Sequence, residues 1–222
     1  MKLYIAYGSN LNIDQMKRRC PDAEIVTTSC INNYQLTFRG NYRGFGVANI
    51  EPKKGARVPV GVWQISQDDE VALDRYEGYP HLYVKQNFMV PINGEGHKAM
   101  AYVMRQGFDP VPPSDSYLQT IADGFNDFRI DKAVLWDGVC WALKRSAESH
   151  ASVLEAFARW QVRYHWPLCP RCGRATVKPK TATNALSRHA DVYVCDECGT
   201  DEAVREFAGK VVPLKEWAIF KK

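Results

Sequence analysis

The chain has 222 residues, of which 45% are apolar, 12% aromatic and 24% charged. This composition indicates a globular protein with one large domain or a medium domain plus a small one, and it excludes disordered, collagen-like and coiled-coil chains. The 29 Lys and Arg residues outnumber the 25 Asp and Glu residues by four. That surplus is too small for the concentrated basic surface of a charge-driven nucleic-acid binder, so net charge identifies no partner.

The apolar segments show no sign of a membrane or export sequence. No run approaches the roughly 20 apolar residues of a transmembrane helix, and the apolar stretch within residues 1–10 is too short for a signal peptide. The seven cysteines are an odd number, which argues against a disulfide framework and for a reducing compartment. We therefore expect a cytoplasmic protein that makes no membrane contact.

The amino-terminal half combines strand and helix patterns. In chain order, the pattern predicts a buried strand at 3–7, a helix at 11–19, short antiparallel strands within 24–65, a helix at 67–76, and strands at 82–92 and 97–105. Turn-forming residues divide the β-rich segment at 32–33, 40–41, 44, 46 and 53–55. The helix at 67–76 has an acidic first turn and is followed by Gly78 and Pro80, which are typical of a helix end.

The composition changes towards the carboxy terminus. A proline-rich linker leads to Ser114, which opens a helix with Tyr117, Ile121 and Phe125 on one face. A strand is predicted at 134–143, and Ser146 is expected to open a helix whose apolar face carries Val153, Phe157, Trp160 and Tyr164. From residue 167 onward the apolar content is too low for an independent core. We therefore expect a domain at 1–145, a connecting helix at 146–166 and a small module at 167–222.

Four of the seven cysteines form two Cys-x-x-Cys pairs. They are Cys169, Cys172, Cys195 and Cys198, and a glycine directly follows each pair. Two sulfurs three positions apart can bind one ion where the backbone turns tightly, so the two pairs can supply four thiolates in a tetrahedron. Four protein ligands leave no open coordination position. The spacing therefore predicts a structural zinc ion, and the segment resembles a zinc ribbon.

Other interpretations of these cysteines stay open. Two reduced pairs or a redox dithiol would have the same spacing, although a redox pair needs no duplicate, and iron can replace zinc. His165 and His189 lie nearby in the sequence, but four cysteines make a complete ligand set without them. The other three cysteines, Cys20, Cys30 and Cys140, are expected to be buried or incidental. A zinc ribbon can also contact protein or nucleic acid.

A second motif, Tyr7-Gly8-Ser9-Asn10, lies where the first strand ends and a helix begins. Backbone N–H groups converge at a helix N-terminus and can bind an anion or a carbonyl oxygen there. Gly8 lets a ligand approach the backbone closely, and Asn10 or Asn12 can cap the helix. An ordinary strand-to-helix turn has the same sequence features.

A third feature is the position of Glu77 in the last turn of a helix, directly before Gly78. The negative end of the helix dipole disfavours a carboxylate there, and burial beside Tyr76 and Tyr79 would add to this effect. Both influences raise the carboxyl pKa towards the range that is useful for proton transfer. A solvated surface carboxylate is the alternative.

Together these motifs resemble the gamma-glutamylcyclotransferase-like family, also called AIG2-like. The resemblance covers roughly residues 1–130. The matching positions are Tyr7–Leu11, Met16, Arg19–Pro21, Ala23, Gly46–Ile50, Gly61–Trp63, Leu73–Asp74, Tyr76–Tyr79, Tyr83, Lys85, Ala101–Tyr102, Pro113–Ser114, Tyr117, Ile121 and Gly124.

This resemblance implies an α+β fold, a mixed β-barrel with flanking helices and a central cavity, followed here by the small zinc-ribbon module. It also implies a reaction in which the α-amino group of a γ-glutamyl amide attacks the γ-carbonyl, releasing 5-oxoproline and an amine without an organic cofactor. Glu77 matches the catalytic glutamate, and the backbone of Gly8, Ser9 and Asn10 would hold the glutamyl oxygens. Tyr7 and Tyr117 match positions that line the cavity.

The resemblance does not select one substrate, because the family acts on γ-glutamyl amino acids, glutathione and γ-glutamylamines. Residues 146–222 depart from the usual single-domain pattern. Two alternatives to an enzyme follow. One is a binding module for a small metabolite or nucleotide whose zinc ribbon engages protein or nucleic acid, and the other is a protein directed mainly at nucleic acid.

Overall fold

The structure is a computed structural model that describes residues 1–146 and 149–221. The chain divides into two compact units, residues 1–142 and 143–222, and each unit is considered by itself. The three-part division expected from the sequence stays a prediction. Among the described residues, no helix combines the length and the apolar content needed to cross a bilayer.

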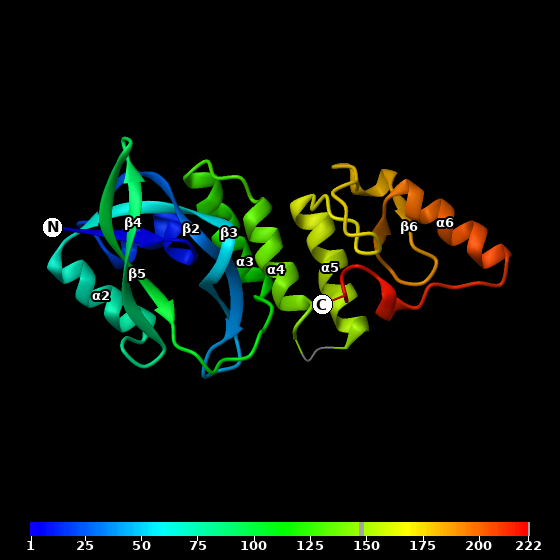
Figure 1. The fold of residues 1–222 in the computed structure, drawn as a ribbon, viewed down its shortest axis with the longest axis horizontal. Helices are drawn as coiled ribbons and strands as arrows, with labels where there is room; N and C mark the ends of the chain where they lie inside the picture. The colour runs from blue at the N-terminus through cyan, green and yellow to red at the C-terminus, as the bar shows by residue number, and fades with distance from the viewer. Residues whose placement is uncertain (147–148, 222) are drawn as a thin grey trace. The chain divides into compact units, whose positions relative to one another are not determined.

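The first unit contains a five-stranded mixed sheet (Figure 1). Its strands are β1 Lys2–Ala6, β2 Glu24–Gly40, β3 Gly46–Ile65, β4 Tyr83–Ile92 and β5 Glu95–Met104, in the order β2-β3-β1-β5-β4. The short strand β1 lies in the middle, antiparallel to β3 and parallel to β5, so that Tyr4 is opposite both Trp63 and Met100. The strands at 3–7, 82–92 and 97–105 are confirmed to within two residues.

The segment 24–65 forms two long strands and not several short ones. Only residues 41–45 turn the chain, while the turn-forming residues at 32–33 and 53–55 lie inside the paired strands. Asn33 has φ 61° and Gly55 has φ 81°, and the Gly55 N–H donates to Asn33 Oδ1. These residues form an irregularity in the ladder, which bends both strands without ending them. The prediction of short strands was therefore wrong.

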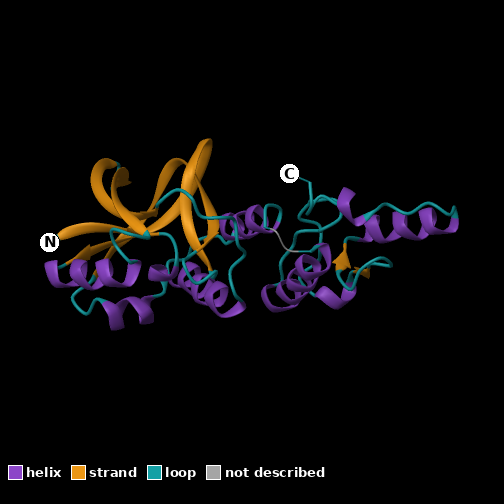
Figure 2. Ribbon diagram, turned by 90° about the horizontal axis from the view of Figure 1, so that it is seen from below, coloured by secondary structure: helices purple, strands orange, loops and turns teal. Residues whose placement is uncertain are grey.

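This bend lets the sheet curl until its two edge strands meet. Ser29 on β2 donates a hydrogen bond to the carbonyl of Pro91 on β4, and the rings of Tyr34 and Phe88 meet edge to face at 5.2 Å. Figure 2 shows the strands curling, with helices of the unit gathered below them. The first unit is therefore a mixed, barrel-like sheet with flanking helices, as predicted.

Four α-helices and one short 3₁₀ turn accompany the sheet. They are the turn η1 Ser9–Leu11 and the helices α1 Ile13–Arg19, α2 Gln67–Glu77, α3 Asp115–Asp127 and α4 Ala133–Leu143. The prediction of a strand at 134–143 was wrong. Leu135, Val139, Ala142 and Leu143 are all buried, and their spacing marks one face of a helix. Gly138 brings α4 close to the backbone of Leu36 on β2.

The second unit contains helix α5 His150–Tyr164, the two-residue strands β6 Ala185–Leu186 and β7 Tyr193–Val194, helix α6 Asp196–Phe207 and the 3₁₀ turns η2 Thr181–Thr183 and η3 Leu214–Glu216. Ser149, not Ser146, caps α5, because its side chain accepts the N–H of Ser152. The buried face of α5 includes Phe157, whose ring stacks on Trp166 at 4.6 Å. Helix α5 therefore contributes to the core of this unit.

Candidate active site

The turn after β1 is wound tightly and lies inside the fold. Leu11 and Asn12 donate backbone hydrogen bonds to the carbonyls of Gly8 and Ser9 at 3.0 Å. Ser9 and Asn10 are both buried. Asn12 caps α1 by accepting the N–H of Gln15, which leaves the Asn10 side chain available for another role. A Cβ on Gly8 would lie 3.0 Å from the Cβ of Ala48, so glycine allows this close approach.

Glu77 is the last residue of α2, and capping residues at the start and the end of this helix fix where it lies. Ser66 and Asp69 form a capping box at the start, and Gly78 ends the helix in the left-handed conformation at φ 63°. Asp74, one turn before Gly78, accepts hydrogen bonds from Tyr102 Oη at 2.6 Å and Lys85 Nζ at 2.8 Å. These bonds tie α2 to the strands β4 and β5.

The Glu77 carboxylate meets the turn through Asn10. The Asn10 amide donates to Glu77 Oε1 at 2.9 Å and to Tyr4 Oη at 2.7 Å. The Arg19 guanidinium donates to Asn10 Oδ1 and lies over the ring of Tyr76, 3.3 Å from its centroid. Arg19 therefore orients the amide so that its NH₂ group faces the carboxylate.

Burial raises the pKa of Glu77 to about 7, although the Arg19 charge and the Asn10 hydrogen bond act in the opposite direction. The expected upward direction is confirmed. The ring centroid of Tyr79 lies 4.7 Å from Lys85 Nζ, and 40% of the residue is exposed. At neutral pH the carboxyl group is therefore poised to accept or release a proton.

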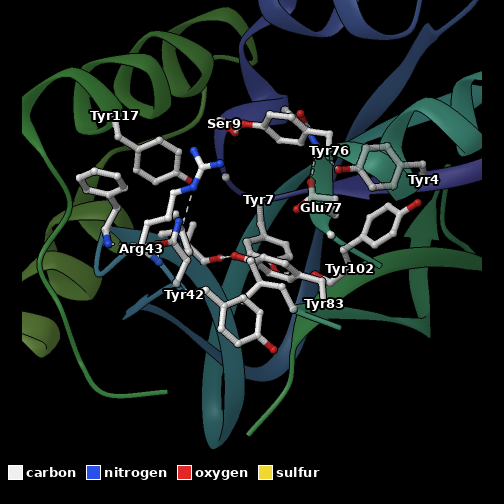
Figure 3. A pocket seen from close by; sticks show the side chains of 18 residues that line it. Tyr4, Tyr7, Ser9, Tyr42, Arg43, Tyr76, Glu77, Tyr83, Tyr102 and Tyr117 are labelled. Carbon is white, nitrogen blue, oxygen red and sulfur yellow. Dashed lines mark hydrogen bonds between the residues drawn. The ribbon is translucent and has the colours of Figure 1, made fainter. Parts of the chain in front are cut away.

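Glu77 and the turn line one pocket of about 460 Å³ (Figure 3). The lining residues are Tyr4, Tyr7, Gly8, Ser9, Asn10, Asn41, Tyr42, Arg43, Phe45, Val47, Ala48, Tyr76, Glu77, Gly78, Leu82, Tyr83, Tyr102 and Tyr117. All six pocket residues singled out in the sequence, Tyr7, Gly8, Ser9, Asn10, Glu77 and Tyr117, are thus brought together. Their functional roles stay predictions.

Phenol groups dominate the pocket wall. Tyr83 Oη donates to the carbonyl of Ala48 at 2.6 Å, Tyr117 Oη accepts the Ala48 N–H at 3.3 Å, and Tyr7 Oη donates to the carbonyl of Tyr102. Burial raises the pKa of Tyr7, Tyr83 and Tyr117 well above the usual value of 10.0. These side chains therefore stay protonated and neutral around Glu77.

Sequence reasoning assigned no role to several residues of this site. Tyr4, Tyr83 and Tyr102 come from three different strands, and only strand pairing brings them together. Tyr42 and Arg43 lie in the turn between β2 and β3, where a sequence pattern indicates only a change of chain direction. The available signal was the number of tyrosines at buried strand positions.

The second unit brings the four predicted metal ligands together. The Sγ atoms of Cys169, Cys172, Cys195 and Cys198 all lie within 4.8 Å of one another. The first pair forms a tight turn in which Gly173 donates to the carbonyl of Cys169, while Cys195 precedes α6 and Cys198 lies in its first turn. Gly199 is helical, and its missing side chain makes room for Ala185. A glycine after this cysteine pair was expected to relieve a tight turn, as Gly173 does after the first pair, and for Gly199 that expectation was wrong.

These sulfurs fit a bound metal ion better than disulfides. Cys172 Sγ and Cys195 Sγ are 3.9 Å apart, against about 2.05 Å for a disulfide bond. A tetrahedral zinc ion with Zn–S bonds of about 2.3 Å separates its sulfurs by about 3.8 Å. The backbone N–H of Cys195 also donates to Cys169 Sγ at 3.4 Å, as expected around bound thiolates.

Comparisons with known proteins agree with the geometry of the first unit. A model of the family described as "Gamma-glutamyl cyclotransferase, AIG2-like" matches residues 4–123. The gamma-glutamylcyclotransferase of Bos taurus is 31% identical over 136 residues, which cover 55% of this chain and 69% of that protein. The enzyme of that name from Mus musculus is 30% identical over 131 residues, with the same two coverages.

A solved structure named "Gamma-glutamyl cyclotransferase" superposes with a TM-score of 0.53 and is 27% identical, covering 57% of this chain and 79% of that one. The family match includes the turn at Tyr7–Asn10 as well as Glu77, and it ends before the cysteine pairs. The chain belongs to the gamma-glutamyl cyclotransferase, AIG2-like family.

Proposed function

We propose that the protein is a gamma-glutamylcyclotransferase-type enzyme that converts a γ-glutamyl amide into 5-oxoproline and an amine. The α-nitrogen of the substrate attacks the γ-carbonyl carbon, a new C–N bond closes the five-membered ring, and the original amide C–N bond breaks. The two protons that the α-ammonium group loses pass to the leaving nitrogen, which departs as an ammonium ion. Membership of the family and the Glu77 carboxyl group in the pocket support this proposal.

Glu77 is the proton carrier in this reaction. A carboxyl group whose pKa is about 7 can take a proton from the α-ammonium group and return it to the leaving nitrogen at similar cost. Asn10 holds the carboxylate through a hydrogen bond of 2.9 Å, so the group has one orientation in the pocket. This placement of Glu77 is the observation on which the proposal depends most.

The turn after β1 supplies the complementary site for the substrate oxygens. Its internal hydrogen bonds use the N–H groups of Leu11 and Asn12. We assign the N–H groups of Gly8, Ser9 and Asn10 to the glutamyl oxygens, where they would stabilise the negative charge that develops on the γ-carbonyl oxygen. Tyr7 and Tyr117, both neutral, line the pocket, and we assign them to contacts with the substrate.

The proposal is tested by incubating the full chain with γ-glutamyl amino acids, glutathione and γ-glutamylamines and measuring 5-oxoproline. We expect product from at least one class and a loss of about 10²-fold or more in Glu77→Gln, which keeps the shape of the side chain but removes the base. Asp68→Asn is the matched control, because Asp68 is an exposed carboxylate on the same helix. No product from any compound, or full activity in Glu77→Gln, would exclude this function.

We further propose that Cys169, Cys172, Cys195 and Cys198 hold one structural zinc ion. With four thiolate ligands the ion has no position for water or substrate, so it stabilises the second unit and takes no part in the reaction. The compact arrangement of the four sulfurs supports this assignment.

A further inference from the structure

The turn between β2 and β3, residues 41–45, lies at the pocket and has a defined shape. Asn41 Oδ1 accepts the backbone N–H groups of Arg43 at 2.9 Å and Phe45 at 3.1 Å. Gly44 takes the left-handed conformation at φ 75°, and its N–H donates to the carbonyl of Asn41. The side chain of Asn41 therefore organises the turn from inside.

Tyr42 ties this turn to neighbouring segments of the first unit. Its Oη donates to the carbonyl of His81 at 3.0 Å, and its ring meets that of Phe108 edge to face at 5.2 Å. His81 belongs to the segment between Glu77 and β4. The hydrogen bond from Tyr42 therefore holds the turn 41–45 against the segment that follows Glu77.

Arg43 is the single cationic side chain among the eighteen lining residues, all of which lie in the described part of the chain. Figure 3 shows its side chain extending into the pocket, with Tyr117 on one side of it and Ser9 and Glu77 on the other. Within residues 1–146 and 149–221 its guanidinium has no hydrogen-bond or ion-pair partner. Arg19, in contrast, is committed to Asn10 and Tyr76.

Ring closure determines which part of a substrate reaches Arg43. The α-nitrogen and the γ-carbonyl carbon must meet beside Glu77, so the leaving group extends away from Glu77 towards the rim, where Arg43 is exposed. A guanidinium group matches the two oxygens of a carboxylate through paired hydrogen bonds. An uncharged amine offers it no such partner.

We propose that Arg43 is a specificity-determining residue that binds a carboxylate on the leaving group. It therefore distinguishes γ-glutamyl amino acids and peptides from γ-glutamylamines. This inference rests on the proposed cyclotransferase function, and it assigns Arg43 to the leaving side of the substrate rather than to the glutamyl side.

The test compares γ-glutamyl-alanine with γ-glutamyl-ethylamine, which differ only in the carboxylate of the leaving group. We expect the full chain to prefer the alanine compound by about 10- to 100-fold in kcat/KM. In Arg43→Gln this preference falls towards one, chiefly through KM for the alanine compound. Arg43→Lys keeps the charge but not the paired donors and should be intermediate. Arg18→Gln, at an exposed arginine of α1, is the matched control and should keep the preference.

Two results would overturn the assignment: no preference in the wild type, or a preference that Arg43→Gln leaves unchanged because it slows both compounds equally or neither of them. Equal losses would place Arg43 on the glutamyl side. If neither compound is turned over, the cyclotransferase function fails for these substrates, and calorimetric binding to Glu77→Gln tests Arg43 separately. Tighter binding of the alanine compound, lost when Arg43→Gln is added, supports the assignment, while equal or absent binding of the two compounds overturns it.

Discussion

At the scale of single residues, the pocket places one titrating carboxyl group among neutral phenols. Burial raises the pKa of Glu77 to about 7 and raises the pKa of Tyr4, Tyr7 and Tyr83 well above their usual value. Between pH 5 and 8 the tyrosines keep their protons while Glu77 gains or loses one. Of these four groups, Glu77 is therefore the one that can exchange a proton near neutral pH.

The raised pKa of Glu77 has a cost in stability that depends on pH. The folded state holds this proton more tightly than the unfolded state. The stability that the bound proton gives the folded protein is therefore fully present below about pH 4.5, and it is lost as pH rises through about 7. We expect Glu77→Gln to match the wild type near pH 4.5 and to be roughly 2 to 3 kcal/mol more stable at pH 8. Urea unfolding at the two pH values measures this difference. If the free energies of unfolding of the variant and the wild type differ by the same amount at both pH values, burial of the Glu77 charge is not the cause of that difference.

Arg19 provides a second test of the same carboxyl group. Its charge lowers the pKa of Glu77, so Arg19→Gln should move that pKa further above 7. The rising limb of kcat/KM against pH is then expected to shift upward by about half a unit to one unit. Arg18→Gln is the control, because Arg18 is exposed on α1. A fall in rate without a shift of the limb would indicate that Arg19 acts only by orienting Asn10.

A site residue can be predicted from the sequence when its position depends on neighbouring residues in the chain, and not when it depends on distant segments. Glu77 and the Tyr7–Asn10 turn are visible in the sequence because a carboxylate before a helix-ending glycine and a glycine at a strand-to-helix turn are local features. Arg43 is not, because nothing within the turn indicates which side of the sheet its side chain faces. The direction of the Arg43 side chain depends on the register of β2 and β3 and on the hydrogen bond from Tyr42 Oη to the carbonyl of His81.

At the scale of elements, the same difference between local and distant causes explains two wrong predictions. Residues 134–143 have strand-like composition, but they form helix α4, and their apolar side chains are buried on the face of that helix that packs against the sheet. Residues 32–33 and 53–55 look like turns when each segment is considered alone. In the structure they lie opposite each other, so an apparent pair of turns becomes one bend in a continuous ladder.

Helix α3 supports the turn of the candidate active site through Gly124. A Cβ at this position would lie 2.5 Å from the backbone nitrogen of Asn12 and 2.7 Å from Leu11 Cβ. Since backbone cannot move aside cheaply, Gly124→Ala should destabilise the first unit by about 1 to 3 kcal/mol and lower activity by displacing the turn. Gly96→Ala is the control, because its Cβ would meet only the flexible end of Met89. Thermal unfolding and kcat/KM report the two effects, and equal behaviour of the two variants would contradict this packing argument.

At the scale of the whole molecule, charge argues against nucleic acid as the partner of the cysteine-containing segment 167–222. Residues 167–222 include ten Lys and Arg against seven Asp and Glu, and the proposed zinc ion with four thiolates would add two negative charges. Several of these cations are paired, namely Arg171 with Asp201, Arg174 with Glu197, Lys178 with Asp196 and Arg188 with Glu206. A nearly neutral surface of this kind lacks the excess positive charge that attracts phosphates.

The cysteine pairs instead compensate for a shortage of secondary structure in their part of the chain. Strands β6 and β7 have two residues each, and the segment 167–180 contains no helix or strand. The proposed metal ion would therefore supply part of the folding free energy of this segment, in addition to the packing of Trp166, Val177 and Trp217.

We therefore expect one equivalent of zinc to copurify with the chain and a strong chelator to unfold the region 167–205 selectively. Limited proteolysis would show new cleavage there, while cyclotransferase activity continues because Glu77 and the turn belong to the first unit. Cys195→Ser should reproduce the effect of the chelator, whereas Cys30→Ser, which alters a cysteine outside the cluster, should not. Loss of activity on chelation, with the first unit still resistant to proteolysis, would show that the metal participates in catalysis and would exclude a purely structural ion.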